Sequence, residues 1–210
     1  EIMKMLLTRL CIDAGVQIYF ETTVSEPIME NRQITGVFIE GKNGRQAIGA
    51  KVVIDCSADA DVAARANVPF VMGSGGKEMT VQPVSMYFTM TRVDIKRLAQ
   101  WAKTSDDIPA VNIPDSDAEL EYGLWLTGFN KSLKSFQERT GIKLQRENIT
   151  LKTAGGVMYV NATRVLGVDV FDPEQFTAAI IECYRQVEAV TKFLREGIPG
   201  FEQANIGQIA

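Results

Sequence analysis

The sequence contains no histidine. This absence excludes serine and cysteine catalysis that relies on a histidine base, and it excludes metal centres built on imidazole ligands. Any chemistry must therefore come from other side chains, from the backbone or from a bound cofactor. The sequence also has no apolar run near the ~18 residues of a membrane span and no signal-peptide pattern, so we expect no membrane partner.

Cysteine is scarce. The three cysteines, Cys11, Cys56 and Cys183, lie far apart and form no C-x-x-C pair. An odd, sparse set is typical of reduced thiols, so we expect a cytoplasmic protein without a disulfide framework. Because Cys56 lies in an apolar run, we expect it to be a small core residue.

No strong excess of one charge is present. The net charge is −4, so the chain lacks the basic surface that would favour nucleic acid as a partner. Hydrophobic residues make up 46% and charged residues 23% of the 210 residues, the balance of an ordinary globular protein. At ~150 residues per domain, this length corresponds to about 1.4 domains.

Residues 1–70 are predicted to form a helix, an antiparallel meander, a buried strand and a short helix. The first helix ends near Gly15 and has no capping residue at its start, so we expect it to begin upstream of Glu1. The run Lys51–Asp55 has the composition of a buried parallel strand. The other expected elements are strands at 17–24, around 28 and at 34–39, and a helix at 61–66.

Residues 71–210 are predicted to form a second domain, after a break rich in glycine and proline between Pro69 and Pro83. Strict alternation over residues 84–91 predicts a strand with one buried and one more polar face. Further along we expect a helix from Asp94, a loop at 106–121, a strand at 124–127, a helix capped by Asn130, a hairpin at 149–160 and a helix from Asp172 to Gly197.

One glycine-rich stretch, Gly73–Lys77, resembles a phosphate-binding loop in composition. However, Val71 and Glu78 stand where that motif requires glycine and a hydroxyl residue. We therefore interpret the stretch as a loop between the two domains.

Three acidic residues follow the Lys51–Asp55 run closely: Asp55, Asp59 and Asp61. A calcium-binding EF-hand loop would need glycine and glutamate where Ala60 and Ala66 stand, so we expect no metal site. Asp59 or Asp61 would favour the N-terminus of the following helix. Asp55 ends a predicted strand of an α/β sheet, which is where such sheets bind ligands.

The stretch AKVVIDCSADADVAARANVPF, residues 50–70, resembles a signature of FAD-dependent oxidoreductases. In these two-domain flavoproteins of the glutathione-reductase-like type, the pattern reads A-K-x-V-I-D-A-T-G-D-x-D-x-A-x-x-A-G-x-P-F. Shorter similarities in the same order occur elsewhere in the chain, at residues 23–24, 34–37, 82–85, 160–165 and 199–202. The resemblance covers nearly the whole chain in patches.

This resemblance implies a flavin-linked enzyme that transfers hydride between a small organic substrate and FAD. The residues that it places against FAD are Val24, Asp55, Ser57, Ala58 and Asp59. Ser57-Ala58 replaces the family's Thr-Gly pair, whose glycine lets the backbone approach the flavin, and Asn67 replaces a second glycine. Asn161 and Arg164 fall on the substrate side.

The fold class that we expect is mixed α/β (α+β), a largely antiparallel sheet packed with helices plus an incomplete Rossmann-like fringe. By the resemblance, residues 1–70 are part of an FAD-binding domain and residues 71–210 are a substrate-binding domain. The family's strand–G-x-G-x-x-G–helix, which receives the FAD pyrophosphate, is absent. We therefore expect a fragment that alone is inactive and binds FAD weakly, with the missing N- and C-terminal segments of the same polypeptide as its partners.

Other interpretations stay open at this stage. The chain could be a non-catalytic α/β ligand-binding module with a groove on the sheet around Val84–Thr91, or an interaction domain that uses the helix Phe176–Leu194. Arg164, whose planar fork suits a carboxylate or phosphate, could instead form a structural salt bridge. No catalytic acid or base is predicted.

Overall fold

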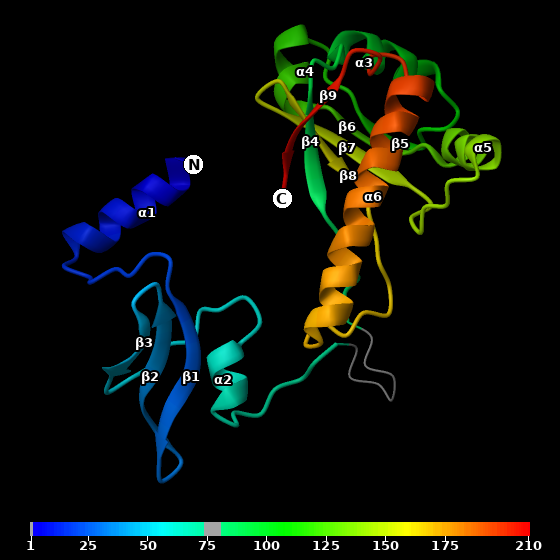
Figure 1. The fold of residues 1–210 in the computed structure, drawn as a ribbon. Coiled ribbons are helices and arrows are strands. Elements are labelled where there is room, and N and C mark those ends of the chain that lie inside the picture. Colours follow the sequence, from blue (N-terminus) through cyan, green and yellow to red (C-terminus); the bar gives the residue numbers. More distant parts are fainter. Residues whose placement is uncertain (1, 74–80) are drawn as a thin grey trace. The chain divides into compact units, whose positions relative to one another are not determined.

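The structure is a computed structural model that describes residues 2–73 and 81–210. The chain divides into two compact units, Glu1–Met72 and Gly73–Ala210, and each is described by itself (Figure 1). Apart from Gly73, the glycine-rich stretch interpreted above as a loop lies outside the described residues. In the described ranges, no helix has both the length and the apolar character needed to cross a bilayer.

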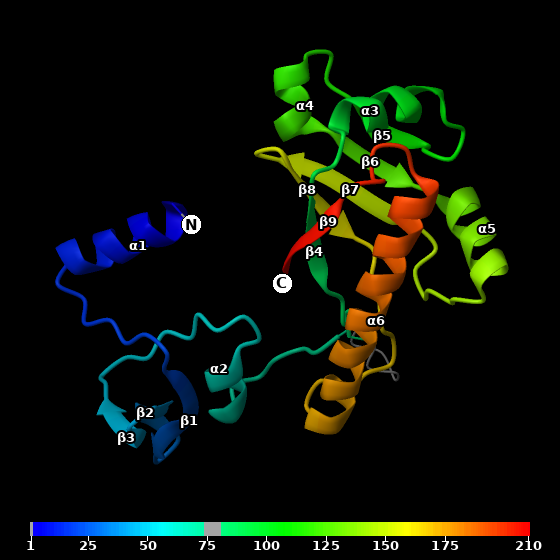
Figure 2. The ribbon, with the colours of Figure 1, turned by 45° about the horizontal axis from the view of Figure 1, so that its top comes forward.

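The first unit is built on a three-stranded antiparallel meander with the order β1-β2-β3. Its elements are α1 (Ile2–Asp13), β1 (Thr23–Glu30), β2 (Gln33–Gly41), β3 (Gly44–Gly49) and α2 (Asp61–Arg65). Helix α2 lies beside β1 (Figure 2). Arg65 Nε on α2 is 3.9 Å from Glu26 Oε1 on β1. The buried hydrophobic side chains among this unit's described residues are only Ile39 and Val62, so its core is small.

Some predictions for the first unit are confirmed and three are wrong. The meander turns and the short helix α2 are confirmed. The strand predicted at 17–24 begins only at Thr23, and Lys51–Asp55 is not a strand. Val52 and Ile54 are 74% and 81% exposed, and Cys56 is exposed rather than buried. A buried parallel strand needs hydrogen-bonded neighbours, and the described residues place none beside this run.

The second unit contains a six-stranded antiparallel sheet with the order β5-β6-β7-β8-β4-β9. Its strands are β4 (Tyr87–Thr91), β5 (Ala110–Asn112), β6 (Trp125–Gly128), β7 (Ile149–Ala154), β8 (Val157–Asn161) and β9 (Asn205–Ile209). Its helices are α3 (Ile95–Thr104), α4 (Asp117–Gly123), α5 (Asn130–Thr140) and α6 (Pro173–Gly197). The mixed α/β fold with a largely antiparallel sheet is confirmed.

The core of the second unit lies on one face of this sheet. Alternate strand residues point to the same face, and the inward residues Phe88, Met90, Leu126, Leu151 and Val160 are fully buried. Helix α6 lies against this sheet (Figure 2). It adds an apolar stripe to the core, with Cys183, Val187, Val190 and Leu194 buried. The helices therefore cover one face of the sheet and leave the polar side of each strand available.

The segment predicted as a loop at 106–121 contains β5 and the start of α4. Ser116 caps α4, because its Oγ accepts a hydrogen bond from Glu119 N at 3.3 Å and donates one to Glu119 Oε2 at 2.7 Å. This serine–glutamate spacing is the capping-box signal, which the prediction overlooked. Strand β9 was also not predicted.

The cap predicted for α5 is wrong. Phe129, at φ 71°, occupies the N-cap position instead of Asn130 and makes no side-chain capping bond. The buried carboxylate of Asp107 takes that role, accepting hydrogen bonds from Lys131 N at 2.7 Å and Ser132 N at 2.8 Å. A cap supplied from a distant segment leaves no local sequence signal.

Candidate functional site

Asp55 organises the loop between the exposed run Lys51–Ile54 and α2. Its Oδ1 accepts hydrogen bonds from Ser57 Oγ at 2.7 Å and Ser57 N at 2.9 Å, and its Oδ2 accepts one from Ala63 N at 2.8 Å. These bonds, that from the Ser57 hydroxyl first, lower the pKa of Asp55 to about 2. The ionised carboxylate therefore ties the loop to the first turn of α2.

The rest of this loop presents its backbone to solvent. Ser57 Oγ accepts a hydrogen bond from Asp61 N at 2.9 Å, so the hydroxyl is engaged within the loop. Ala58 and Asp59 are exposed, and in the described part of the chain their N–H groups have no hydrogen-bond partner. Free N–H groups flanked by small side chains suit a ligand that is held through backbone contacts, and the loop therefore fits a flavin.

Asn67 keeps the backbone geometry that the family's glycine would give. Its φ is 60°, in the left-handed region where asparagine is enriched over other residues with a side chain. Ala58 has no positive φ, so replacing glycine there introduces no backbone strain. Neither replacement distorts the loop.

Val24 lies on β1, the edge strand of the meander, opposite Ile39. It is 37% exposed and adjoins an irregularity in the β1–β2 register between Val24 and Glu26. No hydrogen bond or ion pair among the described residues joins Val24 to the Asp55–Asp59 loop. The structure thus brings Asp55, Ser57, Ala58 and Asp59 together in one loop and leaves Val24 on a neighbouring element of the same unit.

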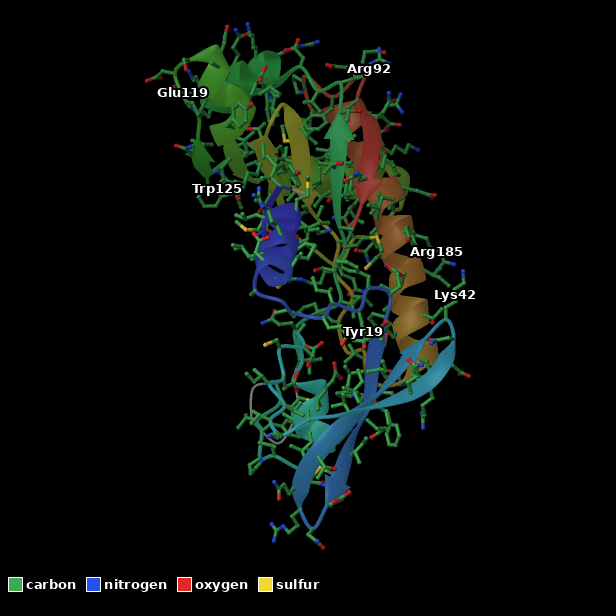
Figure 3. All side chains as sticks on the ribbon, turned by 90° about the vertical axis from the view of Figure 1, so that its left-hand side faces the viewer. Tyr19, Lys42, Arg92, Glu119, Trp125 and Arg185 are labelled. Carbon is green, nitrogen blue, oxygen red and sulfur yellow. The ribbon has the colours of Figure 1, made fainter. Side chains whose placement is uncertain are left out.

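On the second unit, the sheet face opposite the core is polar and aromatic. The register aligns two rows of side chains across β4, β8, β7 and β6: Tyr87, Asn161, Thr150 and Thr127 in one row, and Thr89, Tyr159, Lys152 and Trp125 in the other. Figure 3 shows Trp125 on the side of the unit away from α6, and this side chain is 48% exposed. We call the surface formed by these eight side chains the open face.

Asn161 is the centre of a hydrogen-bond chain on the open face. Its Oδ1 accepts from the Arg146 guanidinium, and its Nδ2 donates to Tyr87 Oη at 2.5 Å. Arg146 also donates to Asn148 Oδ1 at 3.3 Å. The chain joins β4 and β8 to the segment before β7, and it fixes the orientation of the Asn161 amide.

The main chain of Arg164, three residues after Asn161, is held in position by helix α6. The buried Gln186 accepts a hydrogen bond from Arg164 N at 2.8 Å and donates one to Arg164 O at 3.0 Å. Burial, followed by the nearby charge of Arg164, lowers the pKa of the Arg146 guanidinium. In the described part of the chain neither arginine pairs with a carboxylate, so a structural salt bridge of Arg164 is not found.

The sequence did not point to Arg146, Tyr87 or Gln186. The sequence pattern could have identified Tyr87 as a site residue, since it lies on the polar side of the alternating residues 84–91. Arg146 and Gln186 had no such signal, because each reaches its partner across many residues of intervening chain. The described residues contain no group of three or more cysteine, aspartate or glutamate side chains that could hold a metal ion.

Comparison with known proteins identifies the family. A family model described as FAD dependent oxidoreductase matches residues 1–210, the whole of the sequence. No match was found among curated proteins or among solved structures. The match confirms the resemblance seen in the sequence and gives the protein the character of a flavoprotein oxidoreductase with FAD as its cofactor. The chain belongs to the FAD dependent oxidoreductase family.

Proposed function

We propose that the protein transfers hydride between FAD and a small organic substrate that binds on the open face of the second unit. The proposal rests on the observation that the six-stranded sheet is buried on one face only. Helices cover its inner face, whereas the open face keeps polar and aromatic side chains exposed in aligned rows. Such a surface can bind a ligand through stacking and a few oriented polar groups.

The Asp55–Asp59 loop would hold FAD. Asp55 would keep the loop in shape, and the N–H groups of Ala58 and Asp59 would donate hydrogen bonds to acceptor atoms of the cofactor. Val24 would contribute a backbone contact from β1. When bound, FAD takes up a hydride and a proton from the substrate, or returns both, so the protein has to supply position and electrostatics.

Asn161 and Tyr87 would orient the substrate. The Asn161 Nδ2 donates to Tyr87 Oη, so the phenolic oxygen acts as an acceptor and its own O–H proton is left for another acceptor. A substrate oxygen on the open face is a suitable acceptor. Tyr159 and Trp125, both exposed in the neighbouring row, offer apolar area against the substrate.

We also propose a role for each of the two units and a cellular location. Residues 1–70 would be part of an FAD-binding domain and residues 71–210 a substrate-binding domain, in a longer polypeptide whose remaining segments complete the cofactor site. Alone, this piece would be inactive. All three cysteines are free, which supports a reducing, cytoplasmic location.

The test uses the protein encoded by the whole gene, loaded with FAD and mixed anaerobically with a panel of small organic substrates. Loss of the oxidised flavin absorbance reports hydride transfer. We expect Asn161→Ala and Tyr87→Phe to raise KM or lower kcat, whereas Tyr122→Phe, an exposed tyrosine of the same unit, should leave both unchanged. Reduction at the wild-type rate and affinity in the first two variants would contradict a substrate site on the open face. A flavin that no organic substrate reduces would contradict the proposed reaction.

A further inference from the structure

We infer that the substrate carries a carboxylate group, which the guanidinium groups of Arg146 and Arg164 bind at the edge of the open face. This inference rests on the proposed function, because it names the chemical class of the substrate that the open face would receive. It goes beyond that proposal in assigning Arg146, a residue with no sequence signal, to the site.

The first argument is uncompensated positive charge. Arg146 and Arg164 are both half-buried, and the described residues supply neither with a carboxylate partner. Arg146 instead donates to two neutral amides, those of Asn148 and Asn161. Other arginines of this unit, which are more exposed, do pair with carboxylates: Arg97 with Glu202 at 3.2 Å and Arg139 with Glu196 at 3.0 Å. The charge of Arg164 acts unfavourably on the Arg146 guanidinium, and a bound anion would offset this repulsion.

The second argument is preorganisation. The Arg146 hydrogen bonds use Nε and Nη1, so Nη2 has no described partner and remains for a ligand. The Arg164 main chain is fixed in both directions by Gln186. Lys152, in the second row of the open face, adds another positive charge without an ion-pair partner among the described residues. The Arg146 guanidinium and the backbone that carries Arg164 are therefore held in place before any ligand arrives, which reduces the ordering that binding requires.

The third argument concerns the kind of anion. An arginine fork matches a carboxylate or a phosphate, but phosphate sites in proteins commonly add backbone N–H groups from a helix N-terminus or a glycine-rich turn. The donors assigned to this site are side chains. The following helix, α6, has its first N–H groups occupied, because Asp172 Oδ1 accepts from Glu174 N at 2.9 Å and Gln175 N at 3.2 Å. A carboxylate is the anion that these groups favour.

The experiment is calorimetric titration of the purified 210-residue protein with acetate, succinate and inorganic phosphate at constant ionic strength. We expect saturable binding of the carboxylates, weakened at least about tenfold in Arg146→Gln and in Arg164→Gln, with Arg146→Lys in between because it keeps charge without the fork. Arg185→Gln is the matched control. Arg185 lies on α6, away from Trp125 (Figure 3), and its side chain is 73% exposed. Unchanged tryptophan fluorescence would show that the variants are folded.

Three results would overturn the inference: no saturable carboxylate binding by the wild type, carboxylate affinity in both glutamine variants equal to that of the wild type, or phosphate binding more tightly than either carboxylate. The flavin-reduction assay separates this inference from the proposed function. If uncharged substrates reduce the flavin and Arg146→Gln does not alter their kinetics, the carboxylate inference fails while hydride transfer stands. If the variants lose carboxylate binding but no substrate reduces the flavin, the anion site stands while the proposed reaction fails.

Discussion

Gln186 bonds both main-chain groups of Arg164, accepting from its N–H at 2.8 Å and donating to its C=O at 3.0 Å. The Gln186 side chain is 1% exposed. Its amide satisfies both backbone groups of Arg164, as the backbone of a neighbouring strand would. The position of Arg164 beside the open face therefore depends on α6, which lies on the other side of the sheet.

The variant Gln186→Leu should lower the free energy of unfolding of the second unit by about 2–4 kcal/mol, because two backbone groups lose their partners in a buried site. Both tryptophans, Trp101 and Trp125, belong to this unit, so urea denaturation followed by tryptophan fluorescence reports its unfolding. Gln203→Leu, at an exposed position, is the control and should change stability by less than about 0.5 kcal/mol. Equal stabilities of the two variants would show that the Gln186 bonds contribute nothing.

A second prediction concerns the capping of α5 by Asp107. Asp107 is 6% exposed and accepts from two N–H groups at the start of this helix. Replacing it with alanine should lower the free energy of unfolding by about 1–3 kcal/mol, since a cap is lost and the N–H groups are left without acceptors.

The adjacent Asp106 is the matched control, because its ion pair with Lys131 is exposed and such pairs contribute little. The same urea measurement compares the two alanine variants. Asp106→Ala should be clearly the more stable of the two, and the reverse order would mean that Asp107 does not cap α5.

A third prediction follows from the pKa of Asp55. Hydrogen bonds lower this pKa from 3.8 to about 2. They therefore stabilise the ordered loop at pH values above 3.8, the pKa of the unfolded chain, and this stabilisation is lost as the pH falls toward 2. The amide resonance of Ala63, whose N–H donates to Asp55 Oδ2, should therefore titrate with a midpoint near pH 2. NMR spectra of the wild type between pH 5 and pH 1.5, at about half-unit steps, test this.

Two variants sharpen this measurement. Asp55→Asn should abolish the titration of the Ala63 resonance, because no carboxylate remains to be protonated. Asp59→Asn should preserve it, since Asp59 takes no part in the described hydrogen bonds of the loop. A midpoint near 4 in the wild type would mean that Asp55 does not accept these bonds in solution.

A fourth prediction concerns the cofactor. The 210 residues contain no G-x-G-x-x-G motif for the FAD pyrophosphate, and the Asp55–Asp59 loop offers mainly backbone contacts. Titration of this chain with FAD should therefore show weak binding, whereas the product of the whole gene should retain FAD through purification. Stoichiometric binding at micromolar concentration or below, on the order of −8 kcal/mol, would contradict this prediction.

Elements whose signals are local could be predicted from the sequence. Helix α6 begins at Asp172 and Pro173 as expected, because a side-chain cap and a proline at the first helical position act within a single turn. The hairpin β7–β8 turns at Gly155 and Gly156, both at positive φ. In these cases the residues that form the element also determine where it ends.

Features that depend on distant partners could not be predicted. The Lys51–Asp55 run has the composition of a buried strand, but composition does not tell whether a neighbouring strand is present to pair with it. The same limit applies to the site. Asn161 was identified from the family resemblance, whereas Arg146 reaches it from another segment and Tyr87 is 74 residues away.

Strand β4 is synthesised long before the two strands that pair with it. It lies between β8 and β9, and Thr89 on β4 bonds Gln208 on β9 across 119 residues. A nascent chain leaving the ribosome therefore carries β4 with both edges unpaired until β8 has emerged, and with one edge unpaired until β9 follows. Exposed strand edges promote aggregation, and long-range pairing slows folding. Truncation within β9 should thus impair solubility during expression even though every buried side chain of the core precedes it.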